Sequence, residues 1–175
     1  SVEADPRTER EVYLAHFQDC IEAGAASVMG AYNLYQGTHC CHSEYLLREV
    51  LKKEWDFDGF VISDFFFGVK DTVEAANAGL DIEMCHTLYY GERLVQAVRE
   101  GLVAEAVIDE AALRIVRTLL AFTEAEDPQT YPESLVACPE HISLALEAAE
   151  KSMTLMQNRN NVLPFIKEST KRVAV

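Results

Sequence analysis

The amino-acid sequence predicts an α/β protein with a parallel sheet. One observation is the run over residues 59–64, Gly-Phe-Val-Ile-Ser-Asp, which is apolar and β-prone until it ends in a serine and a carboxylate. A buried parallel strand has this composition. The other observation is that such runs alternate with segments whose apolar residues recur at helical spacing. Strand–helix–strand order implies right-handed parallel crossovers.

Several of the expected helices have recognisable ends. Asp5-Pro6 is typical of an N-cap followed by proline at the first helical position, and Ser43 is suited to cap the second helix. Gly24 and Gly79 fall where the first and third helices are expected to stop. The expected helices cover residues 6–22, 43–55, 71–78, 91–100, 109–122 and 140–156.

Short strands are expected over residues 27–32, 59–64 and 80–84, with a loop over residues 33–41. These strands are too few to close a barrel by themselves. Residues 1–122 are therefore predicted to be the C-terminal part of a (β/α)8 TIM-type barrel, of which the first part is missing.

The pattern changes after Phe122. Residues 123–139 hold several prolines and acids without a periodic apolar face, so they are expected to form a linker. Residues 140–175 are expected to begin a second α/β domain, with a strand that starts at Lys171. Because that strand stops at Val175, the chain is expected to be a piece of a longer protein.

The composition excludes some classes of partner. The formal net charge of −14 argues against binding nucleic acid or an anionic membrane through a basic surface. It fits a neutral or cationic small-molecule substrate. No apolar run approaches the roughly 20 residues needed to span a bilayer. No nucleotide-binding glycine loop or Walker-type motif is present, so no organic cofactor is expected.

The cysteines do not form a disulfide framework, because they are odd in number (5) and irregularly spaced. Reduced, mostly buried thiols are expected, which leans toward a reducing, cytoplasmic location. The run His39-Cys40-Cys41-His42 invites a zinc interpretation. Metal ligands are usually spaced by about two to four residues, and adjacent residues of a strand point in opposite directions. No metal site is predicted.

The strongest candidate for a functional residue is Asp64. In α/β sheets and barrels the C-terminal ends of strands are where catalysis takes place, and Asp64 ends a predicted strand beside the aromatic residues 65–67. The alternative is that Asp64 is an ordinary polar residue at a strand end. Asp81 is expected to serve the backbone, and Glu83 to form a structural pair. His86 is expected on the same side as Asp64.

Several motifs of the sequence resemble those of the family 3 glycoside hydrolases, of the two-domain β-glucosidase and β-xylosidase type. The motifs occur in the same order as in that family. They are residues 27–33 (Ser-Val-Met-Gly-Ala-Tyr-Asn), 55–64, 75–84 and 161–164 (Asn-Val-Leu-Pro). The last of these resembles the start of the family's second domain, an α/β sandwich. The resemblance covers nearly the whole chain.

The resemblance implies roles for individual residues. Asp64 falls on the nucleophile that forms a glycosyl–enzyme intermediate. Tyr32 falls on a tyrosine of the pocket for the terminal sugar, and Met29 borders the same region. Phe65 stands where many members have a tryptophan that stacks on the neighbouring sugar. A retaining glycosidase needs a second carboxyl group about 5–5.5 Å from the first. In two-domain members the second domain supplies it.

The resemblance also implies partners. The substrate is expected to be a β-linked glycoside or oligosaccharide with a terminal glucosyl residue. The missing barrel and second-domain segments of the same protein are expected partners, with a homo-oligomer as a further option. Two alternatives stay open: a β-xylosidase of the same family, and a non-catalytic structural fragment.

Overall fold

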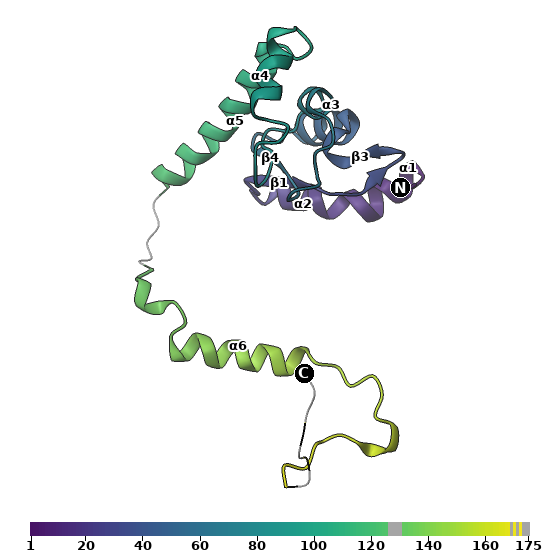
Figure 1. Cartoon of the computed structure of the whole chain (residues 1–175), viewed down its shortest axis with the longest axis vertical. Helices are drawn as coiled ribbons and strands as arrows, with labels where there is room; N and C mark the ends of the chain where they lie inside the picture. Colours follow the sequence, from purple (N-terminus) through teal and green to yellow (C-terminus); the bar gives the residue numbers. More distant parts are fainter. Residues whose placement is uncertain (126–130, 169, 171, 173–175) are drawn as a thin grey trace. The chain divides into compact units, whose positions relative to one another are not determined.

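The computed structural model describes residues 1–125, 131–168, 170 and 172. The chain divides into two compact units, residues 1–125 and residues 126–175. The first unit combines helices with short strands, which confirms the predicted α/β class (Figure 1). None of the helices in the described part of the chain is long and apolar enough to cross a membrane.

The first unit is built around a parallel pair of strands, β1 (Ser27–Gly30) and β4 (Phe60–Ser63). Gly30 pairs with Ser63, so both strands end at the same level. Val61 and Ser63 are fully buried. The parallel pairing agrees with the sequence prediction, although each strand is shorter than predicted. β-Branched residues covered on both faces favour such a strand.

The predicted third strand over residues 80–84 is wrong as a regular strand. Only Ile82 pairs, in a parallel bridge with Ile62. The reason is a side chain: the Asp81 carboxylate accepts the Val61 N–H at 2.7 Å. The Val61 carbonyl in turn accepts the N–H groups of both Asp81 and Ile82, each at 3.0 Å. A carboxylate therefore replaces part of the backbone ladder beside β4.

The predicted loop over residues 33–41 contains a small antiparallel hairpin. Its strands are β2 (Leu34–Tyr35) and β3 (Thr38–His39). The turn residues Gln36 and Gly37 both have positive φ, at 48° and 81°. Two-residue hairpin turns of this kind favour Asn-Gly or Asp-Gly. Here the glycine is present but a glutamine replaces the usual asparagine or aspartate, so the sequence pattern indicates a hairpin only weakly.

The predicted N-terminal helix is present as three consecutive helical segments with wider, π-type turns in the middle. They are α1 (Pro6–Thr8), η1 (Glu9–Leu14) and α2 (Ala15–Glu22). The Asp5 carboxylate accepts the N–H groups of Arg7 and Thr8, each at 3.1 Å, which is the predicted N-cap. Gly24 follows the last turn with a φ of 96°, in the left-handed region that suits glycine.

Four further helices of the first unit follow the predicted order: η3 (Tyr45–Glu54), α3 (Thr72–Ala78), α4 (Glu92–Arg99) and α5 (Glu105–Glu124). The short helix η2 (Cys40–His42) was not predicted, because it begins within the predicted loop. Ser43 Oγ accepts the Leu46 N–H at 3.3 Å. Asp71 caps α3 by accepting the Glu74 N–H at 2.9 Å. α5 begins about one turn before the predicted start.

The core of the first unit surrounds β4. It consists of Cys41, Leu47, Leu51, Phe57, Val61, Val69, Ala75 and Leu80. Gly59 precedes the strand, and a Cβ atom there would lie 2.2 Å from the Ala26 carbonyl oxygen and 2.6 Å from the Phe57 ring. Only glycine permits this close approach. Trp55 packs against the core, although its indole N–H has no acceptor among the described residues.

The second unit has helical segments in its described residues. They are η4 (Glu133–Leu135), α6 (Pro139–Ser152) and η5 (Arg159–Asn161). α6 corresponds to the predicted helix over 140–156 and ends earlier. The predicted strand from Lys171 to Val175 falls almost wholly outside the described residues. The predicted domain boundaries at 122 and 139 stay predictions.

Candidate active site

Asp64 follows β4 directly, at the C-terminal end of the parallel pair. Its N–H donates to the Gly30 carbonyl at 2.9 Å, which ties it to the end of β1. Its Oδ1 accepts the Phe65 N–H at 2.7 Å. The backbone of Asp64 is thus held by the end of β1, and its carboxylate is held by the backbone of the next residue.

Tyr32 follows β1 and lies beside Asp64. The Tyr32 hydroxyl donates to the Phe65 carbonyl at 2.6 Å. Partial removal from water raises the pKa of Tyr32 above its ordinary value. Hydrogen bonding to the nearby Asp64 carboxylate raises this pKa further. The structure therefore brings together two of the residues that the sequence singles out, from two different strands.

Three consecutive phenylalanines form an exposed aromatic wall next to Asp64. The exposed fractions of Phe65, Phe66 and Phe67 are 42%, 55% and 65%. The Phe67 ring lies edge-on to Tyr32, with ring centroids 6.4 Å apart. The Lys70 ammonium lies 5.3 Å from the centre of the Phe67 ring. Aromatic faces of this kind suit stacking on a sugar.

Phe66 has an unusual backbone within this wall. Its φ is 62°, in the left-handed region that bulky residues rarely adopt. A hydrogen bond from its N–H to the Met84 carbonyl at 3.1 Å holds it there. Its ring lies 5.4 Å from the ring of His86, the histidine expected on this side of the sheet.

Met29 is placed differently from the other candidates. It lies in β1 and lines an apolar cavity together with Tyr13, Phe17 and Leu47. Asp64 is not among the residues that line this cavity. The structure therefore does not bring Met29 into one pocket with Asp64, and a role for Met29 in sugar binding stays a prediction.

These segments match known proteins. Residues 1–118 match the family described as "Glycosyl hydrolase family 3 N terminal domain". The chain belongs to glycosyl hydrolase family 3. A beta-glucosidase of Rhizobium radiobacter is 38% identical over 177 residues, which cover 100% of this chain and 21% of the relative. A probable beta-glucosidase I of Aspergillus terreus is 41% identical, over 93% of this chain and 19% of the relative.

Solved structures give the same result. An exo-1,3/1,4-beta-glucanase of a Pseudoalteromonas species matches 94% of this chain and 22% of its own with a TM-score of 0.73 and 30% identity. A beta-glucosidase of Chaetomella raphigera matches 94% of this chain and 25% of its own with a TM-score of 0.68 and 31% identity. The family 3 chain thus spans about a fifth of the curated relatives that it matches.

Two further acidic residues of the family 3 chain have structural roles, as the sequence predicts. Asp81 serves the backbone of β4 through Val61. Glu83 is buried, and its Oε2 accepts the N–H groups of Tyr89 and Tyr90 at 2.8 and 2.7 Å. Asp81 and Glu83 are both buried, whereas Asp64 is half-buried and lies at the C-terminal end of the strand pair.

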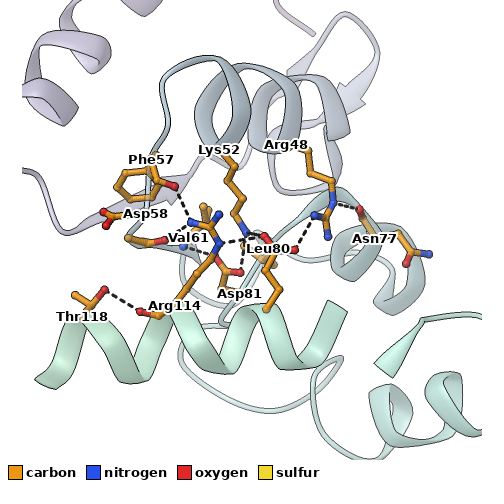
Figure 2. Close-up of polar contacts among 12 residues, drawn as sticks. Arg48, Lys52, Phe57, Asp58, Val61, Asn77, Leu80, Asp81, Arg114 and Thr118 are labelled. Atoms are coloured by element: carbon orange, nitrogen blue, oxygen red, sulfur yellow. Dashed lines mark hydrogen bonds and ion pairs between the residues drawn. The ribbon is translucent and has the colours of Figure 1, made fainter. Parts of the chain in front are cut away.

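A network of charged side chains supports β4 (Figure 2). Glu110 accepts hydrogen bonds from Arg48 at 2.9 Å and from Arg114 at 3.0 Å. Arg114 also donates to the carbonyls of Phe57 and Gly59 at 2.6 and 2.9 Å, in the segment that leads into β4. The network joins η3 and α5 to the strand that ends at the candidate site.

Sequence reasoning did not single out this network. The available signal was the spacing of four residues between Arg48 and Lys52, and between Glu110 and Arg114, which places each pair on one helix face. Burial opposes ionisation of Glu110, but the Arg48 hydrogen bond and the Lys52 charge outweigh it and hold its pKa at about 2. Burial lowers the pKa of Lys52 and raises that of Asp81, while the charge of each opposes the shift of the other.

The histidine and cysteine run does not gather its side chains into one site. Among the described residues, no group of three or more His, Cys, Asp or Glu could hold a metal ion. The rings of His39 and His42 lie 5.5 Å apart. Cys41 is buried in the core, and burial raises the pKa of its thiol to about 11. All the cysteines are free thiols.

Proposed function

We propose that this chain is the nucleophile-bearing segment of a retaining β-glycosidase that releases terminal β-D-glucosyl residues. The observation that supports this most is the position of Asp64. Its carboxylate lies at the C-terminal end of a parallel strand, beside Tyr32 and an exposed aromatic wall, within segments that match beta-glucosidases.

In the proposed mechanism the Asp64 carboxylate attacks the anomeric carbon of the sugar. A carbon–oxygen bond forms to Asp64 while the bond to the leaving group breaks, and a second carboxylic acid protonates the departing oxygen. Water then attacks the anomeric carbon of the glycosyl–enzyme, and the second group, now a carboxylate, takes a proton from the water. The bond to Asp64 breaks, which releases the sugar and returns Asp64 to its carboxylate form. We assign the second group to a segment outside this chain.

The proposal includes the larger architecture. β1 and β4 are parallel and joined through η3, which suits the C-terminal part of a (β/α)8 barrel. Active sites of such barrels lie at the C-terminal ends of the strands, where Asp64 and Tyr32 follow β4 and β1. Residues 140–175 are proposed to begin an α/β-sandwich domain.

The decisive experiment replaces Asp64 in the full-length protein. Asp64→Asn is expected to leave folding nearly unchanged and to remove most turnover of an aryl β-glucoside, because an amide cannot form the covalent intermediate. Asp64→Gly with added azide is expected to recover part of the turnover and to give a glycosyl azide. Near-normal turnover by Asp64→Asn would reject the assignment.

A direct comparison of aryl β-glucoside with aryl β-xyloside tests the sugar. The relatives named above are beta-glucosidases and an exo-glucanase, which favours glucose. Higher kcat/KM on the xyloside would make the protein a β-xylosidase.

On the aglycone side, Phe65 offers an apolar face for stacking but lacks the hydrogen-bonding N–H of an indole.

A further inference from the structure

His42 is a buried histidine with both ring nitrogens engaged. Its side chain is only 3% exposed. Nε2 lies 3.0 Å from the backbone nitrogen of Lys70, and Nδ1 lies 3.1 Å from Oε2 of Glu74. The ring thus connects η2 with two places farther along the chain: the segment that follows Asp64, and helix α3.

These contacts determine the tautomer of the ring. A backbone N–H can only donate, so Nε2 of His42 must be the unprotonated nitrogen that accepts from Lys70. Nδ1 then bears the proton and donates to the Glu74 carboxylate. We therefore assign a neutral imidazole protonated on Nδ1. An imidazolium would place two donors against each other at Lys70.

Lys70 is the last residue of the segment 64–70, which begins at Asp64 and contains the three phenylalanines of the aromatic wall. The start of this segment is held by the hydrogen bonds of Asp64 and Phe65. Its end is held by the Lys70 N–H on the His42 ring. From there the Lys70 ammonium lies over Phe67, whose ring lies edge-on to Tyr32. A chain of contacts therefore leads from His42 through Lys70 and Phe67 to Tyr32, which lies beside the Asp64 carboxylate.

We propose that neutral His42 is a positioning residue for Asp64, acting through the segment 64–70; this rests on the proposed function. His42 does not touch the reacting atoms. It keeps the end of the segment in one place, so that Tyr32 and the aromatic wall keep the carboxylate aligned with the anomeric carbon. Small displacements of a reacting group reduce rates steeply.

The test uses the full-length protein and an activated 2-deoxy-2-fluoro-β-glucoside. Asp64 displaces the leaving group of this probe, and the glycosyl–enzyme then hydrolyses slowly enough to be located by mass spectrometry. The rate of labelling of Asp64 reports alignment, and the probe concentration at half-maximal rate reports binding.

Two substitutions form a matched pair. His42→Gln can still present an amide oxygen to the Lys70 N–H. The amide of His42→Asn is too short for Lys70, although it can still donate to Glu74. We expect His42→Asn to label about tenfold more slowly or worse, and His42→Gln to stay within about threefold of the unmodified protein, with probe binding unchanged in both. His16→Phe, on the exposed face of α2, is the control.

The outcomes are distinct. Labelling of His42→Asn at the rate of the unmodified protein overturns the proposal. Equal slowing of both variants, in step with their thermal midpoints, shows that His42 is only structural and overturns it as well. If the unmodified protein is not labelled at Asp64, the proposed function itself fails, and this is seen before any His42 variant is compared.

Discussion

The carboxylate of Asp81 accepts the backbone N–H of Val61 at 2.7 Å and the ammonium of Lys52 at 2.8 Å. The Asp81 and Lys52 side chains are only 2% and 6% exposed. One buried ion pair therefore joins helix η3 to strand β4, which ends at Asp64. The pair contacts β4 at Val61, three residues before the candidate nucleophile.

Asp81→Ala is expected to destabilise the protein strongly. It leaves the Lys52 ammonium buried without its closest partner and the Val61 N–H without its carboxylate acceptor, and breaking a buried pair costs about 3–5 kcal/mol. The free energy of unfolding in urea measures the effect. Glu49→Ala is the control, because its ion pair with Lys53 is exposed and such pairs contribute about 0–1 kcal/mol. A loss below about 1 kcal/mol for Asp81→Ala would contradict the assigned role.

Glu110 is expected to make stability depend on acid. Its pKa is about 2 in the folded protein against 4.5 for the free side chain. Because the folded value is depressed, its contribution is fully present above pH 4.5 and is lost as the pH falls toward 2. Glu110→Gln is therefore expected to flatten the fall of the thermal midpoint in this window. The same substitution at the exposed Glu44 is expected to leave the slope unchanged. Equal slopes for Glu110→Gln and the unmodified protein would count against the prediction.

Gly68 is expected to be essential for the geometry around Asp64. A Cβ atom at Gly68 would lie 2.7 Å from the backbone oxygen and 2.9 Å from the backbone nitrogen of Asp64. Gly68→Ala should therefore displace Asp64 and reduce kcat on an aryl β-glucoside more than tenfold. Gly37→Ala is the control: it strains a positive φ without a close contact, so it should lower stability and leave kcat unchanged. Normal kcat in Gly68→Ala would show that the segment relaxes without moving Asp64.

The isolated 175-residue chain is expected to associate with itself and to lack measurable glycosidase activity. Apolar side chains of α5 are 51–68% exposed: Leu113, Val116, Leu119, Leu120 and Phe122. Leaving a few hundred Å² of apolar surface in water forfeits on the order of 5–10 kcal/mol, which rivals the stability of a typical domain. Binding of a hydrophobic dye and sedimentation velocity test this. A monomer that melts cooperatively and turns over an aryl glycoside would refute it.

The position of Asp64 could be predicted because its signal is local. An apolar run that ends in Ser-Asp indicates the end of a buried strand, and the helix cap at Asp5 is likewise encoded within a few residues. The hairpin around Gln36 was missed because its turn lacks the usual asparagine. The irregular pairing beside Val61 was missed because apolar and acidic residues alternate over residues 80–84, as they do in a half-buried strand. This alternation does not show that a side chain replaces part of the backbone pairing.

By itself the sequence determined the α/β class, the order of the longer helices and of the two paired strands β1 and β4, and the carboxylate at the end of β4. These follow from periodicity and from capping residues, which act over one or two turns of chain. Only the tertiary structure decided which distant groups meet: Arg114 on the carbonyl of Gly59, Lys52 on Asp81, and His42 on the N–H of Lys70. Such pairs form because buried polar groups must find partners wherever the fold places them, and local sequence patterns do not show those places.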